Sequence, residues 1–288
     1  MVDNKVQEFQ VEIREIEANG MTFHCRVCGL GNTGEPVILL HGFPESSYMW
    51  ESILKFLAAQ GYRCLAPDLR GYSPQARPKG IKNYRIDKIA SDVVALADVL
   101  GFQEFHLVAH DWGAGCGWTV VELYPDRVNS WSVLSVPHME AWYKAKKNNC
   151  DQIKLSWYIT LFQLPIIPEL LLGIATFIPC FRKFVWKESD TTAYLDVFSK
   201  FTGRKSIINW YRANYKLPIA YGEVSVPTIL IWGNKDIAFA RSGIEDTKNY
   251  MSSRDYQLIE IDAGHTLVQD APNKVRDEIF NHIQKHPF

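Results

Sequence analysis

The stretch Phe105-His106-Leu107-Val108-Ala109-His110-Asp111-Trp112-Gly113-Ala114 decides the fold. Its apolar start predicts a buried strand over residues 105–109, and a helix is expected to begin directly after the carboxylate of Asp111. Ala109 and Gly113 suit a sharp turn, because a larger side chain there would clash with the adjoining backbone. Taken alone, Asp111 has two interpretations: a catalytic carboxylate at the apex of the turn, or a cap at the N-terminus of the helix.

Strands and helices alternate on both sides of this stretch. Alternating residues around Asn19-Gly20 predict a β-hairpin, with strands at residues 9–13 and 21–27. Further strands are predicted at residues 36–40, 63–66, 128–136, 226–232 and 256–261, and helices at residues 49–60, 86–100, 113–124 and 272–285. This alternation predicts an α/β fold, in which a mostly parallel sheet is covered by helices on both faces.

One segment breaks the alternation. From residue 137 to residue 217 the strand signal disappears, and the sequence looks helical and rich in aromatic residues. We therefore expect a helical cap at residues 137–217, inserted into a core made of residues 1–136 and 218–288. The apolar run at residues 159–181 is long enough to suggest a membrane span, but it is interrupted by Pro165, Pro168, Glu169 and Pro179, which favours an apolar cap or the wall of a tunnel.

Composition restricts the possible partners. The 288 residues carry a net charge of -1 without a dense run of Lys or Arg, so neither nucleic acid nor an anionic membrane surface is expected as a partner. Residues 1–8 lack the apolar core of a secretory signal, and we expect a cytoplasmic protein, with an anchor removed from the N-terminus as the open alternative. The sequence leaves the oligomeric state open.

The six cysteines are widely spread, and a chain of this size does not need disulfides, so we expect free thiols. Cys25 and Cys28 form a lone C-x-x-C without a second pair of ligands, and no metal site is expected there.

Asp111, Asp236 and His265 each follow a predicted strand. In an open α/β sheet this position places them at the carboxyl edge, where ligands bind. Their order along the chain, nucleophile, acid and histidine, is the order of the α/β-hydrolase triad, which favours the catalytic interpretation of Asp111 over the helix cap. His41 and His110 are interpreted as structural neighbours of this site.

The sequence resembles the epoxide hydrolases of the α/β-hydrolase superfamily over nearly the whole chain. The core motifs that carry the resemblance are His41-Gly42-Phe43-Pro44, Asp68-Leu69-Arg70-Gly71-Tyr72, His110-Asp111-Trp112-Gly113, Lys235-Asp236 and Gly264-His265. In the cap, Trp157-Tyr158 and Asn209-Trp210-Tyr211-Arg212 are similar to the segments that hold the two ring-opening tyrosines. Ala109 in place of the first elbow glycine, and Ser73-Pro74-Gln75 after the Arg-Gly-Tyr motif, depart from the family pattern.

The resemblance implies a role for each of these residues. Asp111 would attack the epoxide and form an ester, since a carboxylate is ionised at neutral pH and needs no base to attack an sp³ carbon. Tyr158 and Tyr211 would protonate the oxygen that is released, although packing within the cap is the alternative interpretation of both side chains. His265, oriented by Asp236, would activate the water that hydrolyses the ester.

Backbone N–H groups of Phe43 and Trp112 would stabilise the oxyanion formed in that step. The implied reaction converts a small hydrophobic epoxide and water to a vicinal diol, and it requires neither a metal nor an organic cofactor.

Three alternatives compete with this prediction, two other enzyme activities and a protein without catalytic activity. Haloalkane dehalogenases share the Asp nucleophile and the Trp that follows it, but they usually carry Asn at the position of Phe43. Fluoroacetate dehalogenases carry Arg at the position of Trp112. A hydrolase-like protein that only binds a ligand is the third alternative, and the intact set of Asp111, Asp236 and His265 argues against it.

Overall fold

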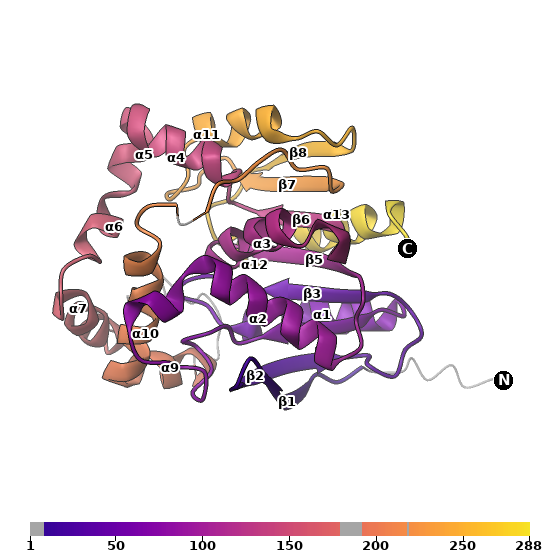
Figure 1. Ribbon diagram of the computed structural model, residues 1–288. Helices are drawn as coiled ribbons and strands as arrows, with labels where there is room; N and C mark the ends of the chain where they lie inside the picture. The colour runs from indigo at the N-terminus through magenta and orange to yellow at the C-terminus, as the bar shows by residue number, and fades with distance from the viewer. Residues whose placement is uncertain (1–8, 179–191, 218) are drawn as a thin grey trace.

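A single mixed sheet forms the centre of the molecule (Figure 1). The computed structural model describes residues 9–178, 192–217 and 219–288. Within these residues eight strands pair in the order β1-β2-β4-β3-β5-β6-β7-β8. Strand β2 is antiparallel to both of its neighbours, and all the other neighbouring strands are parallel. The strands are β1 (Glu12–Ala18), β2 (Met21–Cys28), β3 (Pro36–Leu40), β4 (Arg63–Pro67), β5 (Phe105–His110), β6 (Val128–Leu134), β7 (Thr228–Gly233) and β8 (Tyr256–Ile261).

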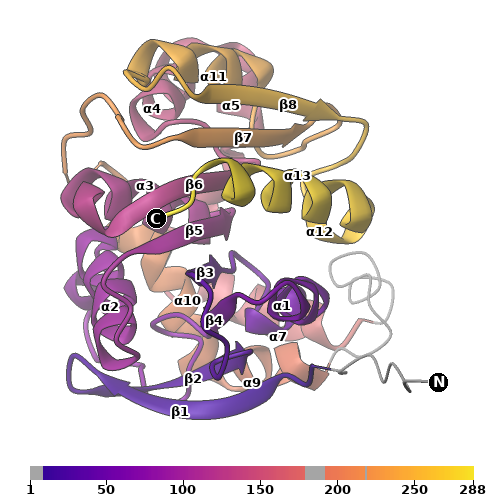
Figure 2. The same ribbon diagram turned by 90° about the vertical axis from the view of Figure 1, so that its right-hand side faces the viewer.

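Helices cover both faces of this sheet, which confirms the predicted α/β class. Figure 2 shows α2 and α3 on one side and α1, α12 and α13 on the other. The described helices outside residues 137–217 are α1 (Glu51–Ala59), α2 (Ile86–Val99), α3 (Trp112–Leu123), α11 (Arg241–Asp246), α12 (Leu267–Asp270) and α13 (Pro272–Lys285). Short 3₁₀ turns occupy Ser47–Trp50, Ile81–Tyr84, Pro125–Arg127 and Thr247–Tyr250.

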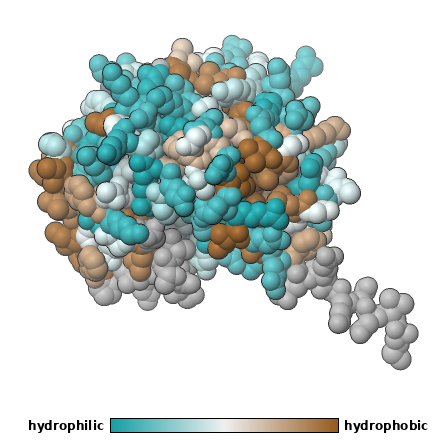
Figure 3. All heavy atoms as spheres, turned by 60° about the horizontal axis from the view of Figure 1, so that its bottom comes forward, coloured by the Kyte–Doolittle hydropathy of each residue, from teal (hydrophilic) through white to brown (hydrophobic). Residues whose placement is uncertain are grey.

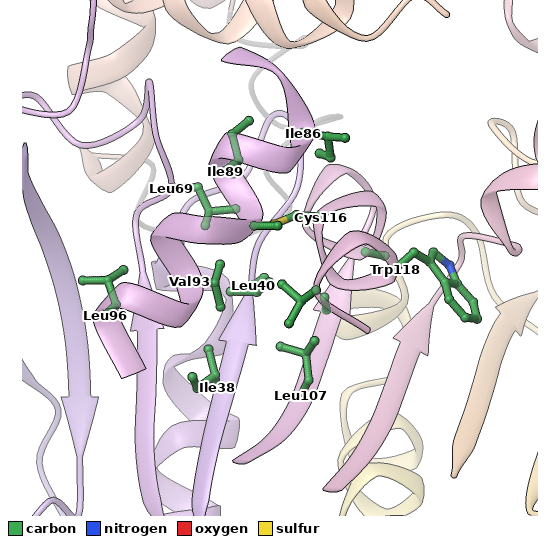
Figure 4. Packing of buried hydrophobic residues seen from close by; sticks show 14 of the residues in the cluster. Ile38, Leu40, Leu69, Ile86, Ile89, Val93, Leu96, Leu107, Cys116 and Trp118 are labelled. Atoms are coloured by element: carbon green, nitrogen blue, oxygen red, sulfur yellow. The ribbon is translucent and has the colours of Figure 1, made fainter. Parts of the chain in front are cut away.

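Packing between α2 and the central strands shows why these segments fold as they do (Figure 4). Ile89, Val93 and Leu96 recur at helical spacing, so they lie on one face of α2 and are buried against side chains from β3 and β5. Strand β3 is buried at every position because helices lie on both sides of it, which explains its unbroken apolar run. Burial of each aliphatic side chain of this kind contributes about 1.5–3 kcal/mol to the free energy of folding.

The first strand differs from the prediction. The alternation at residues 9–13 predicted a strand there, whereas β1 runs from Glu12 to Ala18. β1 is at the edge of the sheet, and its first four residues are exposed, with two charged residues in a row at Arg14-Glu15 that interrupt the alternation. The hairpin turn at Asn19-Gly20 was predicted correctly, since Ala18 pairs with Met21 across it.

Six described helices lie between β6 and β7 in the sequence. In Figure 1 they stand at the left, beyond one end of the sheet. The helices are α4 (Met139–Asn148), α5 (Cys150–Leu155), α6 (Trp157–Leu161), α7 (Ile167–Thr176), α9 (Thr192–Ser199) and α10 (Phe201–Ala213). Their helical character agrees with the sequence analysis, and the division into a core (1–136 and 218–288) and a cap (137–217) stays a prediction.

Helix α7 presents an apolar face to solvent. Figure 3 shows hydrophobic residues gathered at the left rim of the molecule, on the side where Figure 1 places α7. Four α7 residues there are exposed by 47–62%: Ile167, Leu170, Leu171 and Ile174. This part of the apolar run at 159–181 is therefore exposed and is not the wall of a tunnel, whereas its assignment to an apolar cap stays a prediction. Residues 179–181 lie outside the described residues. No helix in the described part of the chain is both long and apolar enough to cross a membrane.

The turn between β5 and α3 is packed against the end of β3 with almost no space between the two backbones. A Cβ placed on Gly113 would lie 2.4 Å from the carbonyl oxygen of Leu40, and one on Gly42 would lie 2.3 Å from Cβ of Asp111. Both distances are shorter than any van der Waals contact, so glycine is required at both positions by the close approach of two backbone segments.

We predict that Gly113→Ala destabilises the fold by about 1–3 kcal/mol or more, because a backbone carbonyl cannot move aside as a flexible side chain can. Gly115→Ala, in the same helix, is the matched control. A Cβ at Gly115 would meet its nearest neighbours at 3.9 Å, so this variant should gain up to about 1 kcal/mol of helix propensity. Urea unfolding of both variants measures the difference, and equal losses of stability would contradict the close approach at Gly113.

Candidate active site

Asp111 lies at the junction of β5 and α3 with an unusual backbone conformation. Its φ is 50° and its ψ is −123°, a region that residues other than glycine rarely adopt. The close packing of β3 against the turn holds this strained conformation in place. The side chain is 8% exposed, and its Oδ1 accepts a hydrogen bond of 2.7 Å from the backbone N–H of Phe43.

A chain of hydrogen bonds connects the three side chains that the sequence grouped together. Nε2 of His265 lies 3.3 Å from Oδ2 of Asp111, and its Nδ1 lies 2.8 Å from Oδ2 of Asp236. The other oxygen of Asp236 accepts the N–H groups of Ala238 and Phe239, at 2.6 and 3.0 Å. Each Asp236 oxygen therefore has its own function: Oδ1 binds the loop that carries the residue, and Oδ2 binds the imidazole.

Two side chains hold the backbone of His265, one at the end of β5 and one directly after β6. His110 Nε2 donates to the carbonyl oxygen of His265 at 2.9 Å, and the Ser135 hydroxyl donates to the same oxygen at 3.0 Å. The interpretation of His110 as a structural neighbour agrees with this contact. Burial, with the charge of His265, lowers the pKa of His110 to about 4, so it stays neutral. Ser135 was not predicted, because a serine after a strand carries no signal for a partner 130 positions away.

His41 also has a backbone partner. Its Nε2 accepts the N–H of Leu69 at 3.0 Å, and its Nδ1 lies 3.0 Å from the carbonyl oxygen of Gly42. The ring therefore connects the motif at residues 41–44 to the loop at residues 68–72, as expected for a structural neighbour of the site.

The charges of Asp111 and His265 stabilise one another. Burial favours the neutral form of Asp111, but the hydrogen bond and charge of His265, with the Phe43 N–H, outweigh it, and the pKa of the carboxyl is lowered. Burial would also lower the pKa of His265, but the charge of Asp236 and the hydrogen bonds to both carboxylates raise it to about 10. At neutral pH the site therefore holds an imidazolium between two carboxylates.

A pocket opens above Asp111, and its wall is largely apolar. The lining residues come from the core and from the helices between β6 and β7: Ile86, Asp111, Trp112, Gly115, Val136, Met139, Trp142, Ser156, Tyr158, Ile159, Tyr211, Asn214, Leu217, Tyr221, Ala238 and Phe239. Of the described part of the run at 159–181, only Ile159 contributes. The wall thus comes mainly from α3, α4 and α6, from the end of α10 with the segment after it, and from the loop after β7.

Tyr158 and Tyr211 enter the pocket from different helices, α6 and α10. Their ring centroids are 5.9 Å apart, and the Tyr211 ring lies 4.9 Å from that of Trp112. Burial raises the pKa of both phenols, and the nearby carboxylate of Asp111 raises it further. Both hydroxyls therefore stay protonated and can donate a hydrogen bond. The structure brings both tyrosines to the same pocket as Asp111, as the sequence predicted.

Hydrogen bonds to the core fix α10 over the sheet. Trp210 Nε1 donates to the carbonyl oxygen of Arg70 at 2.8 Å, and Asn214 Oδ1 accepts the N–H of Ile86 at 2.8 Å. Arg70 itself forms a buried ion pair with Asp92, with two bonds of 2.7 Å. Because Tyr211 follows Trp210 directly, this network also sets the position of its phenol.

Phe43 and Trp112, the predicted oxyanion-hole residues, both adjoin Asp111. Phe43 provides the backbone donor described above, and its ring packs edge-on against Tyr211, with a centroid distance of 5.6 Å. Trp112 begins α3, directly after Asp111, and its side chain lines the pocket.

Five cysteines are free thiols, which confirms the expectation for Cys25, Cys28, Cys64, Cys116 and Cys150; Cys180 lies outside the described residues. Among the residues that the structure describes, no group of three His, Cys, Asp or Glu side chains is arranged to hold a metal ion.

Comparisons with known proteins agree with this geometry. The family described as the alpha/beta hydrolase fold matches residues 35–154. The human protein Epoxide hydrolase 4 is 31% identical over 284 residues, which cover 94% of this chain and 78% of that protein. Epoxide hydrolase 1 of Caenorhabditis elegans is 32% identical, over 89% of this chain and 67% of that protein.

Solved structures give the same result. An epoxide hydrolase from Vigna radiata has a TM-score of 0.80 at 30% identity, and the alignment covers 98% of this chain and 100% of that chain. An epoxide hydrolase from Bacillus megaterium, solved with an inhibitor, also has a TM-score of 0.80, with 94% of this chain and 100% of that chain covered. Its identity is 24%, so it supports the fold alone.

The raised pKa of His265 predicts how stability changes with pH. A histidine whose pKa is higher in the folded than in the unfolded chain contributes its full stabilisation below about pH 6.5 and loses it as the pH rises to about 10. The free energy of unfolding of the wild type should therefore fall towards that of His265→Gln between these values. Urea unfolding at pH 6, 8 and 10 measures the difference, with the partly exposed His24→Gln as control. Parallel curves for wild type and His265→Gln would contradict the ion pair.

Proposed function

The chain belongs to the epoxide hydrolases of the α/β-hydrolase fold, and on that basis we propose that it converts an epoxide and water to a vicinal diol through an ester on Asp111. Family membership supports hydrolysis of epoxides, whereas the ester route and the residue roles are our proposal. One observation carries it: the carboxylate of Asp111 opens on a pocket that also holds the neutral phenols of Tyr158 and Tyr211, and the imidazole of His265 lies beside the carboxylate.

In the first half-reaction, Oδ of Asp111 attacks one epoxide carbon, and the bond from that carbon to the ring oxygen breaks. The electron pair moves to the oxygen, which takes a proton from Tyr158 or Tyr211, so that no free alkoxide forms. A carboxylate suits this step because the target is an sp³ carbon, and because the lowered pKa of Asp111 keeps it ionised at neutral pH.

Formation of the ester removes the negative charge of Asp111. Since that charge helps to raise the pKa of His265, the imidazolium then releases its proton more readily, and the phenolate left by ring opening is a suitable acceptor. The neutral imidazole, still oriented by Asp236, takes a proton from water, which attacks the carbonyl carbon of the ester. The tetrahedral intermediate then collapses, and the bond between the carboxyl carbon and the substrate oxygen breaks. The diol oxygen takes the proton of the new carboxyl group, so that Asp111 returns to the carboxylate and His265 to the imidazolium of the resting site. The same carboxylate charge thus favours attack in the first step and, by its loss, frees the base for the second.

The oxyanion of the second half-reaction develops on the carboxyl oxygen that is not bonded to substrate. Oδ1 already accepts the N–H of Phe43 at 2.7 Å, so this donor is in place before the reaction begins. We assign the backbone N–H of Trp112 as the second donor. Each such donor is typically worth about 2.7–4 kcal/mol in the transition state.

The pocket favours a hydrophobic epoxide. Its wall is formed by side chains such as Met139, Trp142, Leu217 and Phe239, which offer dispersion contacts and few hydrogen bonds. Asp111, Tyr158 and Tyr211 supply the groups that act on the epoxide ring, whereas these apolar side chains bind the remainder of the substrate.

We predict that His265→Gln accumulates the ester, because ring opening needs only Asp111 and the tyrosines, whereas ester hydrolysis needs a base. Mass analysis of the peptide containing Asp111, after mixing with an aryl or fatty-acid epoxide, should show the added mass of the substrate. In the wild type, one turnover in ¹⁸O-water should instead place label in this peptide, since water attacks the carboxyl carbon. Asp111→Asn should show neither result.

Diol formation without label in the peptide would exclude the ester route. Chloride release from a chloroalkane, without diol from any epoxide, would favour a dehalogenase.

We also predict that Tyr158→Phe and Tyr211→Phe each slow ester formation by about 100-fold, because one donor to the ring oxygen is lost while the other remains. Rapid-quench measurement of the ester isolates this step. Tyr221→Phe is the matched control: it removes a third phenol from the pocket wall, but one whose oxygen already pairs with Thr119 at 2.8 Å. An equal effect of all three substitutions would assign the tyrosines to packing rather than proton transfer.

A further inference from the structure

Gln152, on helix α5, is fully buried and uses its side-chain amide to connect two parts of the active site. Its Nε2 donates to the carbonyl oxygen of Ala238 at 2.9 Å and to the hydroxyl of Ser156 at 3.0 Å. Its Oε1 accepts the N–H of Ala240 at 2.9 Å. Both donors and one acceptor position of the amide are therefore used, and two of the three bonds cross from the helices after β6 to the loop after β7.

That loop, residues 236–240, carries Asp236. The N–H groups of Ala238 and Phe239 bind Oδ1 of Asp236, while the carbonyl of Ala238 and the N–H of Ala240 bind Gln152. Thus the peptide group between Ala238 and Phe239, whose N–H binds the carboxylate, is itself held by the glutamine through its carbonyl oxygen. Ile237, within the same loop, is 65% exposed, so little apolar packing holds the loop at that residue.

The third bond leads to a ring-opening tyrosine. Ser156 directly precedes α6, and its N–H also bonds to the backbone carbonyl of Gln152 at 3.0 Å. Tyr158 follows two residues later, in the first turn of α6. A single side chain thus holds the start of the helix that carries one proton donor and the loop that carries the acid of the triad.

We propose that Gln152 is a positioning residue that fixes Asp236 and Tyr158 relative to one another, so that a helix outside the sheet supports the orientation of the triad. The proposal rests on the function proposed above. Asp236 acts on substrate only through His265, and a small displacement of its loop would rotate the carboxylate away from Nδ1. Misplacement of a catalytic group by about 1 Å can cost about 100-fold in rate.

The test is Gln152→Leu, which fills a similar volume and makes no hydrogen bonds. Rapid-quench experiments with an aryl epoxide give the rates of ester formation and ester breakdown as functions of pH. We expect breakdown to slow by about 10- to 100-fold and formation to slow less, because His265 and Asp236 act mainly in breakdown.

The pH profile of ester breakdown separates positioning from a general loss of structure. The charged or titratable groups that face His265 are Asp236, Asp111 and His110. In the ester Asp111 is neutral, and His110 is buried and neutral, so Asp236 is the carboxylate that still raises the pKa of His265. If its contact is loosened, this pKa falls, and the rise of the breakdown rate with pH should move to lower pH than in the wild type.

Asn32→Ala is the matched control. The Asn32 amide also binds two backbone carbonyls, of Ala58 and Tyr62, at 2.8 and 2.9 Å, but it precedes β3, at the opposite end of that strand from the elbow. Its breakdown rate and pH profile should match the wild type. Gln152→Met, with a more adaptable side chain, serves if Gln152→Leu does not fold, and urea unfolding shows which variants are folded.

Two outcomes would overturn the assignment of Gln152 alone: a folded variant whose ester breaks down at the wild-type rate, or formation and breakdown slowed equally with an unchanged pH profile. A wild-type enzyme that never forms an ester on Asp111 would instead overturn the proposed function, and the role of Gln152 with it.

Discussion

The backbone of β3 approaches the turn at Asp111 so closely that no side chain fits between them. This contact holds Asp111 at a φ of 50° and excludes a Cβ from Gly42 and Gly113. It also places the N–H of Phe43 within 2.7 Å of the carboxylate. The conformational strain and the hydrogen-bond donor thus have one origin, since both follow from seating the elbow against the end of a neighbouring strand. The sheet therefore contributes to the chemistry as well as supporting it.

Charge balance is the second constraint. Two carboxylates and one imidazole are buried together, and removal of charges from water is tolerated only when they are paired. The pairing is complete in the resting site, where His265 contacts both Asp111 and Asp236. In the proposed mechanism this balance changes at one defined moment, when Asp111 becomes an ester. A serine at the elbow would carry no resting charge, and the imidazole would then have no comparable change to respond to.

The sequence predicted what depends on local pattern and missed what depends on distant contacts. An unbroken apolar run marks β3, alternating apolar residues mark β8 and helical spacing marks α13, so all three were placed with the observed bounds. The exposed edge strand β1 was misplaced because its side chains mostly face water, and the alternation of charged and apolar residues breaks at Arg14-Glu15. The fourteen residues from 272 to 285 were predictable, whereas the first strand was shifted by three residues at its start.

The candidate site divides in the same way. Asp111, Asp236 and His265 were grouped because each follows a strand, and Tyr158 and Tyr211 because their segments resemble the family. Residues that are far apart in the sequence and contact each other only in the folded chain carry no such sequence signal. Ser135 and Gln152 reach backbone atoms of His265 and Ala238 from 130 and 86 positions away, and a backbone atom gives no hint in the sequence of which side chain will bind it.

Polar contacts join the helices after β6 to the core at separated points. Trp210 binds the carbonyl of Arg70, Asn214 binds Ile86, and Gln152 binds the loop after Asp236. Directional bonds of this kind fix the tyrosines against the triad more sharply than apolar packing would. The pocket wall between these points is apolar, and contacts there depend on volume rather than direction. Substrate range can therefore change through the wall while the reacting groups keep their geometry, because different physical interactions hold the two parts.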